Sequence, residues 1–302
     1  MRNIAKRWLI IILVLALALG MASALAGCGF FTSYQRVVQG SGALKQQKVP
    51  LSNRADGYTL RVTDVSFQLR GRAELKLVID ESLDRMALLE TDSNIMPLLR
   101  LDCNPTTGEI RLSAPRGTYF SPTKLILTVG VPVQGIAVDG VWEISYDCPS
   151  VKACRVTTDG STSGDFTFGA LDSLDIQLEG LSDIDVRCAS ARTCRITGDG
   201  DVNGAFAFGD MDSLDLCING LSKISMSGSA RRAVIQLDGD SNIRAFDLTA
   251  RDADVTISGL GSCEITAEQS LHAVIDGSGS ITYGGSPAVS QQVDGLGSVK
   301  AR

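Results

Sequence analysis

The chain has 302 residues, of which 44% are hydrophobic, 21% charged and 5% aromatic, and it contains 31 glycines. This composition is typical of a globular protein with a sizeable core and excludes disordered and fibrous chains. A net charge of −6 and a pI near 4.9 argue against a nucleic-acid partner, which would need a basic surface. His272 is the single histidine, which excludes multi-histidine metal sites and disfavours a Ser/His/Asp triad.

The first 27 residues have the features of a bacterial export signal. Arg2, Lys6 and Arg7 form a positive start, and 8–19 is an apolar run. That run is short for a bilayer span of about 20 residues but fits the core of a signal peptide. Leu25-Ala-Gly-Cys28 then matches the lipobox of bacterial lipoproteins. The match implies cleavage after Gly27 and a diacylglycerol on the thiol of Cys28, with acylation (palmitate) of the new N-terminus in some bacteria. The alternative is an uncleaved anchor with an incidental cysteine.

Both alternatives place the rest of the chain outside the cytoplasmic membrane. Removal of residues 1–27 leaves 25 Lys and Arg against 34 Asp and Glu, a net charge of −9. We expect the lipid on Cys28 to attach the protein to the cell membrane, or to the outer membrane in a bacterium that has two membranes. Residues 28–48 show no sustained periodicity and are predicted to be a tether.

An internal repeat runs through the second half of the chain. Segment 151–186 matches 191–226 at 17 of 36 positions. A shorter period lies within it, because glycine recurs after a polar residue at intervals of 18 to 20 residues. These glycines are Gly160, Gly180, Gly200, Gly220, Gly239, Gly259, Gly277 and Gly295. A repeat of this length is typical of proteins built from stacked units.

Apolar residues alternate before the glycines, as in Leu174, Ile176 and Leu178. Alternation of this kind predicts strands, and a polar residue followed by glycine predicts a turn with positive φ. A fixed phase within each repeat favours coils that stack about 4.8 Å apart. The sequence therefore predicts an all-β fold, a right-handed parallel β-helix (β-solenoid) with coils of about 20 residues.

Charged residues support this register because their signs alternate in two columns. One column holds Lys152, Asp172, Arg192 and Asp212, followed by Arg231 or Arg232, and the other holds Arg155, Asp175, Arg195 and Asp215. Opposite charges on neighbouring coils are mildly favourable, whereas like charges would oppose stacking.

The same register places cysteines in the interior. Cys154 and Cys194 alternate with leucines, and Cys188 lies between phenylalanines. Cys154 and Cys194 are two coils apart, about 9.6 Å, which is too far for a disulfide. Disulfides Cys148–Cys154 and Cys188–Cys194 within a coil are one alternative in an exported protein, and buried free thiols are the other. Cys263 is predicted to lie in the core. With Cys28 lipidated, seven cysteines remain, so at least one thiol is unpaired or bonded to another molecule.

Residues 49–147 are less regular than 148–302. Segments 58–63, 75–79 and 124–129 are predicted strands, and 92–98 a short helix. We expect this region to supply an N-terminal cap and the first coils, because the first open edge of the stack needs cover. The whole domain is predicted to span residues 49–302, with regular coils over 148–302.

This arrangement resembles the family described as "putative auto-transporter adhesin, head GIN domain". The resemblance lies in an acidic strand end at 77–82, the strand at 109–112, and the closing glycine-rich turns at 276–287 and 294–299. It covers roughly residues 60–302 and implies a β-helix with an adhesin-like role. The last repeat ends the sequence, so the lipid anchor is expected to replace the C-terminal membrane barrel that self-transport would use.

An enzyme is the alternative class, because parallel β-helices include polysaccharide lyases and hydrolases. Their sites need clustered carboxylates, or carboxylates with calcium and a basic residue, in an open groove. In this sequence the obvious Asp and Arg columns pair by sign, so we expect no catalytic residue. No phosphate loop, nucleotide fingerprint or CxxC metal motif is present in the sequence.

A calcium loop is a weaker alternative at 199–204. Asp199, Asp201 and Asn203 fit the first half of an EF-hand loop, with Asp210 in the place of its closing glutamate. The equivalent segment 159–164 lacks the acidic ligands, so we expect a turn and no metal site. The acidic column Asp159, Glu179 and Asp199 is a further place that could attract a cation.

Aromatic residues offer little evidence for a sugar platform. Trp142, Tyr146 and Tyr283 are expected to pack or cap rather than stack on a sugar ring, and His272 to lie on the surface. The sequence therefore predicts a cell-envelope lipoprotein with a non-catalytic binding or scaffolding domain. The expected partner is a glycan or a surface protein, and we expect no cofactor. A polysaccharide lyase or hydrolase is the alternative.

Overall fold

The computed structural model describes residues 36–51, 57–63, 66–67, 74–115 and 118–302, and residues 37–302 form one compact unit. Apart from two short 3-10 helices, the regular structure of these residues is all β. Among them no helix has the length and hydropathy that a membrane crossing requires. The predicted signal peptide and Cys28 lie outside the described residues.

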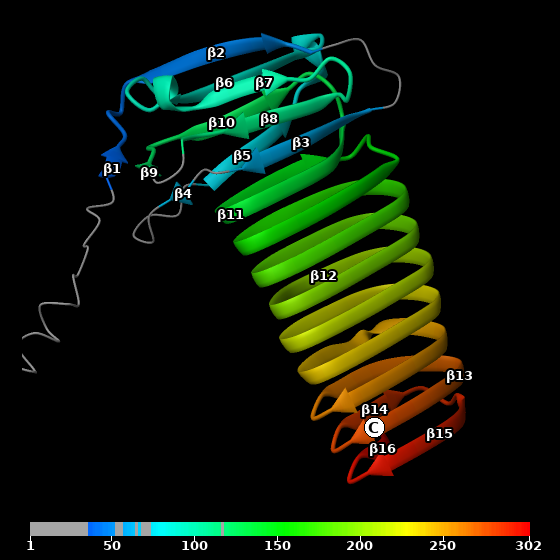
Figure 1. The fold of residues 1–302 in the computed structure, drawn as a ribbon. Helices are drawn as coiled ribbons and strands as arrows, with labels where there is room; N and C mark the ends of the chain where they lie inside the picture. Colours follow the sequence, from blue (N-terminus) through cyan, green and yellow to red (C-terminus); the bar gives the residue numbers. More distant parts are fainter. Residues whose placement is uncertain (1–35, 52–56, 64–65, 68–73, 116–117) are drawn as a thin grey trace, which may run out of the picture. The chain divides into compact units, whose positions relative to one another are not determined.

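Stacked parallel coils make up the C-terminal two-thirds of this unit (Figure 1). They consist of β11 (Val133–Cys148), β12 (Ala153–Gly259), β13 (Ser262–Gly277), β14 (Ser280–Gly284), β15 (Ala288–Gly295) and β16 (Ser298–Ala301). Gly140 pairs with Gly160 at an offset of 20 residues, and Gly259 pairs with Gly277 at an offset of 18. The observed register therefore matches the predicted repeat. It begins at Gly135, before the predicted boundary at residue 148, because β11 already pairs in parallel with the next coil.

One corner of every coil is a glycine, and we call these residues the corner glycines. They are Gly140, Gly160, Gly180, Gly200, Gly220, Gly239, Gly259, Gly277 and Gly295, and all have positive φ. A Cβ atom on Gly160 would lie 2.5 Å from the carbonyl oxygen of Gly140. Glycine is therefore required here for two reasons: the backbone has positive φ, and the neighbouring coil leaves no space for a Cβ atom.

Alternating side chains fill the interior of the coils. Leu174, Ile176 and Leu178 are each 1% exposed, as the sequence pattern predicts. Phe166 and Phe168 stack with ring centroids 6.5 Å apart, and both rings meet Tyr146 edge-on. The burial of these apolar side chains is the main force that holds the stack together.

The N-terminal strands extend the stack and cover its first coil. β3 (Tyr58–Thr63) and β5 (Glu74–Ile79) both pair in parallel with β11. Beyond β5 lie β10 (Leu125–Val129), β6 (Met86–Asp92) and β2 (Leu44–Pro50), while β8 (Glu109–Ser113) and β7 (Arg100–Cys103) follow β3. β1 (Arg36–Gln39), β9 (Thr118–Ser121) and β4 (Ser66–Phe67) form a separate small sheet. The predicted strands at 58–63, 75–79 and 124–129 are confirmed.

Two details of this region differ from the sequence prediction. The helix predicted at 92–98 is only one 3-10 turn, η2 (Met96–Leu98), and a second turn, η1 (Glu81–Leu83), precedes β6. The tether predicted for 28–48 was wrong at its C-terminal end, because 36–39 and 44–50 are strands. β2 is paired antiparallel with β6 through its backbone while most of its side chains face solvent, so hydrophobic periodicity could not reveal it.

Asp92 holds the start of β2 in place although it is completely buried. Its carboxylate accepts hydrogen bonds from the Gly42 amide at 2.7 Å and from the amide and hydroxyl of Thr123 at 2.7 and 2.8 Å. Burial alone would raise the pKa of Asp92, but these hydrogen bonds outweigh it and hold the pKa below its ordinary value. The charged carboxylate thus links β2, β6 and the segment before β10.

Candidate functional site

A groove of about 450 Å³ lies on the outer face of the sheet where β3 meets β11 and the next coils. Its hollow reflects the size of the side chains that face outward. Gly135, Ala137 and Ala153 are small, whereas Arg61, Glu109, Gln134, Arg155 and Asp175 stand around them. Since β3, β11 and the first coils pair in parallel, these residues lie side by side although they are far apart in the sequence. We call this feature the junction groove.

One carboxylate oxygen in the junction groove lacks a partner. Oδ2 of Asp175 accepts a hydrogen bond from Nε of Arg155 at 2.9 Å, as the predicted charge column requires. Oδ1 of Asp175 is buried and takes no hydrogen bond in the described part of the chain. A buried acceptor without a donor is costly, so this carboxylate oxygen is an unsatisfied group beside the junction groove, although the oxygen itself is not exposed.

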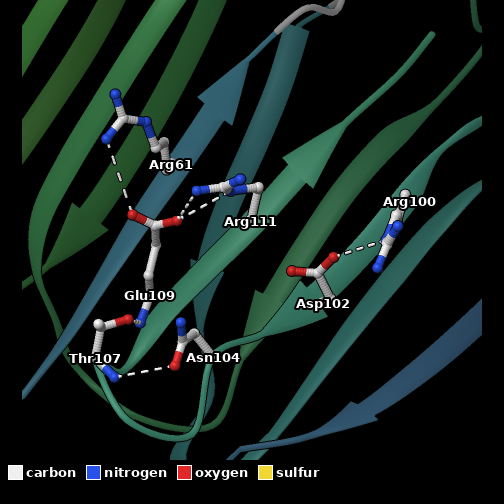
Figure 2. Close-up of polar contacts among 7 residues, drawn as sticks. All are labelled: Arg61, Arg100, Asp102, Asn104, Thr107, Glu109 and Arg111. Atoms are coloured by element: carbon white, nitrogen blue, oxygen red, sulfur yellow. Dashed lines mark hydrogen bonds and ion pairs between the residues drawn. The ribbon is translucent and has the colours of Figure 1, made fainter.

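Glu109 forms the opposite wall of the groove, at the start of β8 (Figure 2). Its Oε1 accepts hydrogen bonds from Nε and Nη2 of Arg111 at 2.9 and 2.6 Å, and its Oε2 lies 3.9 Å from Nη1 of Arg61. These hydrogen bonds raise the pKa of the Arg111 guanidinium above its ordinary value. Arg61 thus lies between a carboxylate on β8 and the hollow above Ala137.

The β7–β8 turn fixes the position of Glu109. Oδ1 of Asn104 accepts hydrogen bonds from the amides of Thr106 and Thr107, and the Thr107 hydroxyl accepts one from the amide of Glu109 at 3.3 Å. Figure 2 shows this turn directly below the Glu109 side chain. Hydrogen bonds within the β7–β8 turn therefore fix the start of β8, from which the Glu109 side chain extends into the wall of the groove.

A second hollow of about 240 Å³ adjoins the junction groove, since Arg61, Ala137 and Thr157 line both. Its other walls include the acidic residues Asp139, Asp159 and Glu179. The two hollows give one surface that has both arginines and carboxylates at the junction-groove end and mainly carboxylates at the other end. Hydroxyl-rich molecules suit such a surface, because each hydroxyl both donates and accepts.

Other predicted ion pairs form along the coils. Arg195 lies 3.9 Å from Asp215, and Arg231 lies 2.8 Å from Asp212. All four side chains are substantially exposed, so each pair contributes little to stability. Their effect is to favour the native register of the coils.

The seven described cysteines are free thiols, and Cys148, Cys154, Cys188 and Cys194 are all buried. Burial raises the pKa of Cys154 to about 12, and a further increase comes from Cys148. Burial likewise raises the pKa of Cys194, with a smaller contribution from Cys188. The two predicted disulfides stay predictions. Cys263 is buried in the core, as predicted.

The aromatic candidates do not reach the surface of the groove. Trp142 is buried and donates a hydrogen bond from Nε1 to the Asp139 carbonyl at 3.1 Å. Tyr146 is also buried, and its hydroxyl donates to the Val133 carbonyl at 2.8 Å. Tyr283 is half-buried, and the exposed His272 pairs in register with Asp254.

The residues of the calcium alternative lie along extended strand rather than in a loop. Asp201 accepts a hydrogen bond from Asn203 at 2.9 Å, and Asp210 accepts one from Ser229 at 2.5 Å. Within the described ranges no group of three or more His, Cys, Asp or Glu side chains has the arrangement of a metal site.

No pattern in the sequence predicted the junction groove. Arg61, Glu109 and Arg155 come from three separate segments, and only the pairing of β3 with β8 and β11, and of β11 with β12, brings them together. The small residues Ala137 and Ala153 were the available signal, since small side chains between longer ones leave a hollow.

Stacked parallel coils with a strand-built cap define the structural class, and comparisons with known proteins agree. Residues 189–287 match the model of the family "Putative auto-transporter adhesin, head GIN domain", which confirms the predicted resemblance. A putative adhesin from Parabacteroides merdae ATCC 43184 is 18% identical with a TM-score of 0.58, over 88% of this chain and 99% of that chain. A putative lipid binding protein from Parabacteroides distasonis ATCC 8503 is 20% identical with a TM-score of 0.53, over 88% of this chain and 100% of that one. These similarities concern the fold alone. A comparison with curated proteins gives no match.

Proposed function

We propose that this chain is a cell-envelope lipoprotein, anchored outside the cytoplasm through Cys28, whose right-handed parallel β-helix binds a glycan in the junction groove. The lipobox and the adhesin description of the matching family support the location. The same family description, together with a structural relative described as a putative adhesin, supports a binding role. Stacked coils suit this role because they present long, rigid faces.

The observation that carries the glycan proposal is the partnerless Oδ1 of Asp175. Because this oxygen is buried, the Asp175 carboxylate would rotate toward the groove on binding, and a sugar hydroxyl would then supply the missing hydrogen bond. Arg155, Gln134 and Thr157 line the same groove and offer donors and acceptors to neighbouring hydroxyls. The small side chains of Ala137 and Ala153 leave room for the ring.

Ion pairing favours binding over catalysis. Glu109 and Asp175, the two carboxylates of the junction groove, each lie against an arginine. A glycosidase needs one carboxyl group that holds a proton and a second that remains ionised. In the junction groove both carboxylates are paired with arginine, an arrangement that suits a binding site.

A glycan array tests this proposal with residues 29–302, which include the whole compact unit. The wild type is expected to retain intact glycans. Asp175→Ala removes a charged acceptor whose hydrogen bond contributes about 1.5–3 kcal/mol, so we expect affinity to fall about 10- to 150-fold. Asp215→Ala is the matched control, because Asp215 occupies the equivalent position two coils away and also pairs with an arginine.

Three results would contradict the proposal. Equal binding by Asp175→Ala and the wild type would show that the junction groove is not the glycan-binding site. Shortened glycans, detected by mass spectrometry of the eluate, would make the protein a polysaccharide lyase or hydrolase. Absence of glycan retention by the wild type would leave a protein partner as the ligand.

A further inference from the structure

Exposed apolar side chains are concentrated on one ridge of the coil stack. Among the described residues, seven large hydrophobic side chains are exposed, and five of them directly follow a corner glycine. These five are Val141, Leu181, Leu221, Leu260 and Leu296. We call the line of residues that follow the corner glycines the corner ridge. None of these five side chains lines the junction groove or its adjoining hollow.

The apolar residues of the corner ridge occur on every second coil. The coils between them place Ser161, Asp201, Asp240 and Ser278 at the equivalent position. The corner glycines stack directly on one another, so consecutive leucines are two coils, or about 9.6 Å, apart. The three central leucines thus span about 19 Å along one edge of the stack.

The fold does not require leucine at these positions. Leu181, Leu221 and Leu260 are 59%, 60% and 66% exposed, so they contribute little to the core. Serine and aspartate occupy the same corner in the intervening coils without a change of register. Exposed apolar residues in a regular row point instead to a partner.

Negative charge flanks the corner ridge. The residue before the corner glycine is acidic in most coils, namely Asp139, Asp159, Glu179, Asp199, Asp238, Asp276 and Asp294. All of these are exposed, and Asp139 pairs in register with Asp159 as Asp276 does with Asp294. Asp201 and Asp240 add charge on the corner ridge itself. Within three residues after a corner glycine, the described chain has one cation, Lys223.

We propose that the corner ridge docks a cationic amphipathic helix of a partner protein or peptide. Apolar residues seven positions apart on a helix are separated by about 10.5 Å, close to the two-coil spacing of the leucines. A helix of about 13 residues matches the 19 Å from Leu181 to Leu260. Lysine or arginine beside its apolar stripe would face the acidic residues before the corner glycines.

Charge selects this occupant over two others. A second copy of the chain, docked ridge to ridge, would bring two acidic rows together. An anionic membrane surface would likewise meet the acidic row with like charge. A cationic helix places opposite charges at the same position.

Fluorescence anisotropy with a synthetic helical peptide tests the proposal on residues 29–302. The probe has leucine at the first and fourth positions of each heptad and lysine elsewhere, and the same peptide with glutamate for lysine is the control. We expect binding of the lysine peptide, weakened by salt, and none of the glutamate peptide. Leu181→Ser/Leu221→Ser/Leu260→Ser should weaken binding at least tenfold, because serine is the residue that other coils carry there. The matched control, Leu44→Ser/Val289→Ser, should stay within twofold of the wild type.

A second variant tests the charge separately. Glu179→Gln/Asp199→Asn/Asp238→Asn should weaken binding and reduce its dependence on salt. Equal affinity of the triple-leucine variant and the wild type would overturn the proposal, because nonspecific attraction to an acidic protein would then explain the binding. Leucine-dependent dimerisation in sedimentation, or leucine-dependent binding to vesicles of anionic phospholipid, would also overturn it. Glycan binding by the triple-leucine variant is measured in parallel. If the variant loses the peptide but still retains the glycan, the corner ridge and the junction groove are independent binding surfaces.

Discussion

Gly200→Ala tests whether the corner glycines are required by the contact between coils. Gly200 has a φ of +121°, and a Cβ atom there would lie 2.3 Å from the carbonyl oxygen of Gly180. The backbone conformation alone costs a non-glycine residue about 1–3 kcal/mol. The contact with Gly180 cannot be relieved by a side-chain movement, because the atom it meets is backbone. We therefore expect a total loss of about 3–5 kcal/mol in the free energy of unfolding.

Gly42→Ala is the matched control for this prediction. Gly42 also has positive φ, at +76°, but a Cβ atom there has nothing within 4 Å. Urea unfolding followed by circular dichroism measures both variants. The difference between them isolates the contact between coils, which should account for about 2 kcal/mol. Variants that agree within about 0.5 kcal/mol would refute the reasoning, because conformation alone would then explain the glycine.

Three further predictions concern buried groups. Asp92→Asn should lower the free energy of unfolding by about 2–3 kcal/mol at pH 7. The pKa of Asp92 is lowered in the folded state. Its contribution to the free energy of unfolding is therefore complete above the unfolded pKa of about 3.9 and is lost as pH falls through the folded pKa. Urea melts should accordingly show the stabilities of the wild type and the variant converging below about pH 4. In reduced native protein at pH 8, iodoacetamide should modify the exposed Cys217 and spare the buried Cys154, whose pKa is about 12. Equal rates of modification of the two cysteines, measured by mass spectrometry, would contradict this. Phe166→Ala should cost about 3–5 kcal/mol in urea melts, and a loss below about 1 kcal/mol would show that the ring lies outside the core.

The coils could be predicted from the sequence because each repeat contacts only its two neighbours, so one repeat length fixes the contacts of every coil. Once Gly160 and Gly180 set the period, the position of Asp175 beside Arg155 followed from arithmetic, and the observed ion pair agrees. Interior placement of Leu174 and Cys154 followed in the same way. Each coil repeats the environment of the last, so a local pattern carries long-range information.

The N-terminal region lacks this redundancy. β2 is paired through backbone groups, and its Lys45 and Gln46 face solvent, so no apolar pattern identifies it. Asp92 is a charged residue in the core, and only its donors at Gly42 and Thr123 explain its burial. These partners lie far apart in the sequence, which local patterns do not record.

The two proposed binding surfaces also differ in how far the sequence pattern could predict them. The junction groove depends on contacts among β3, β8 and β11, which no periodicity specifies. The corner ridge follows a period of 40 residues, visible in Leu181 and Leu221, but its exposure becomes evident only when the coils are stacked. The lipid on Cys28 and the two disulfides stay predictions from the sequence.

A crystal structure of residues 29–302 with a glycan retained on the array is the most direct test of the central claim. We predict that a hydroxyl of the bound sugar donates a hydrogen bond to Oδ1 of Asp175, with the ring above Ala137 and Ala153. A glycan bound elsewhere, with Oδ1 of Asp175 still without a donor, would contradict the account.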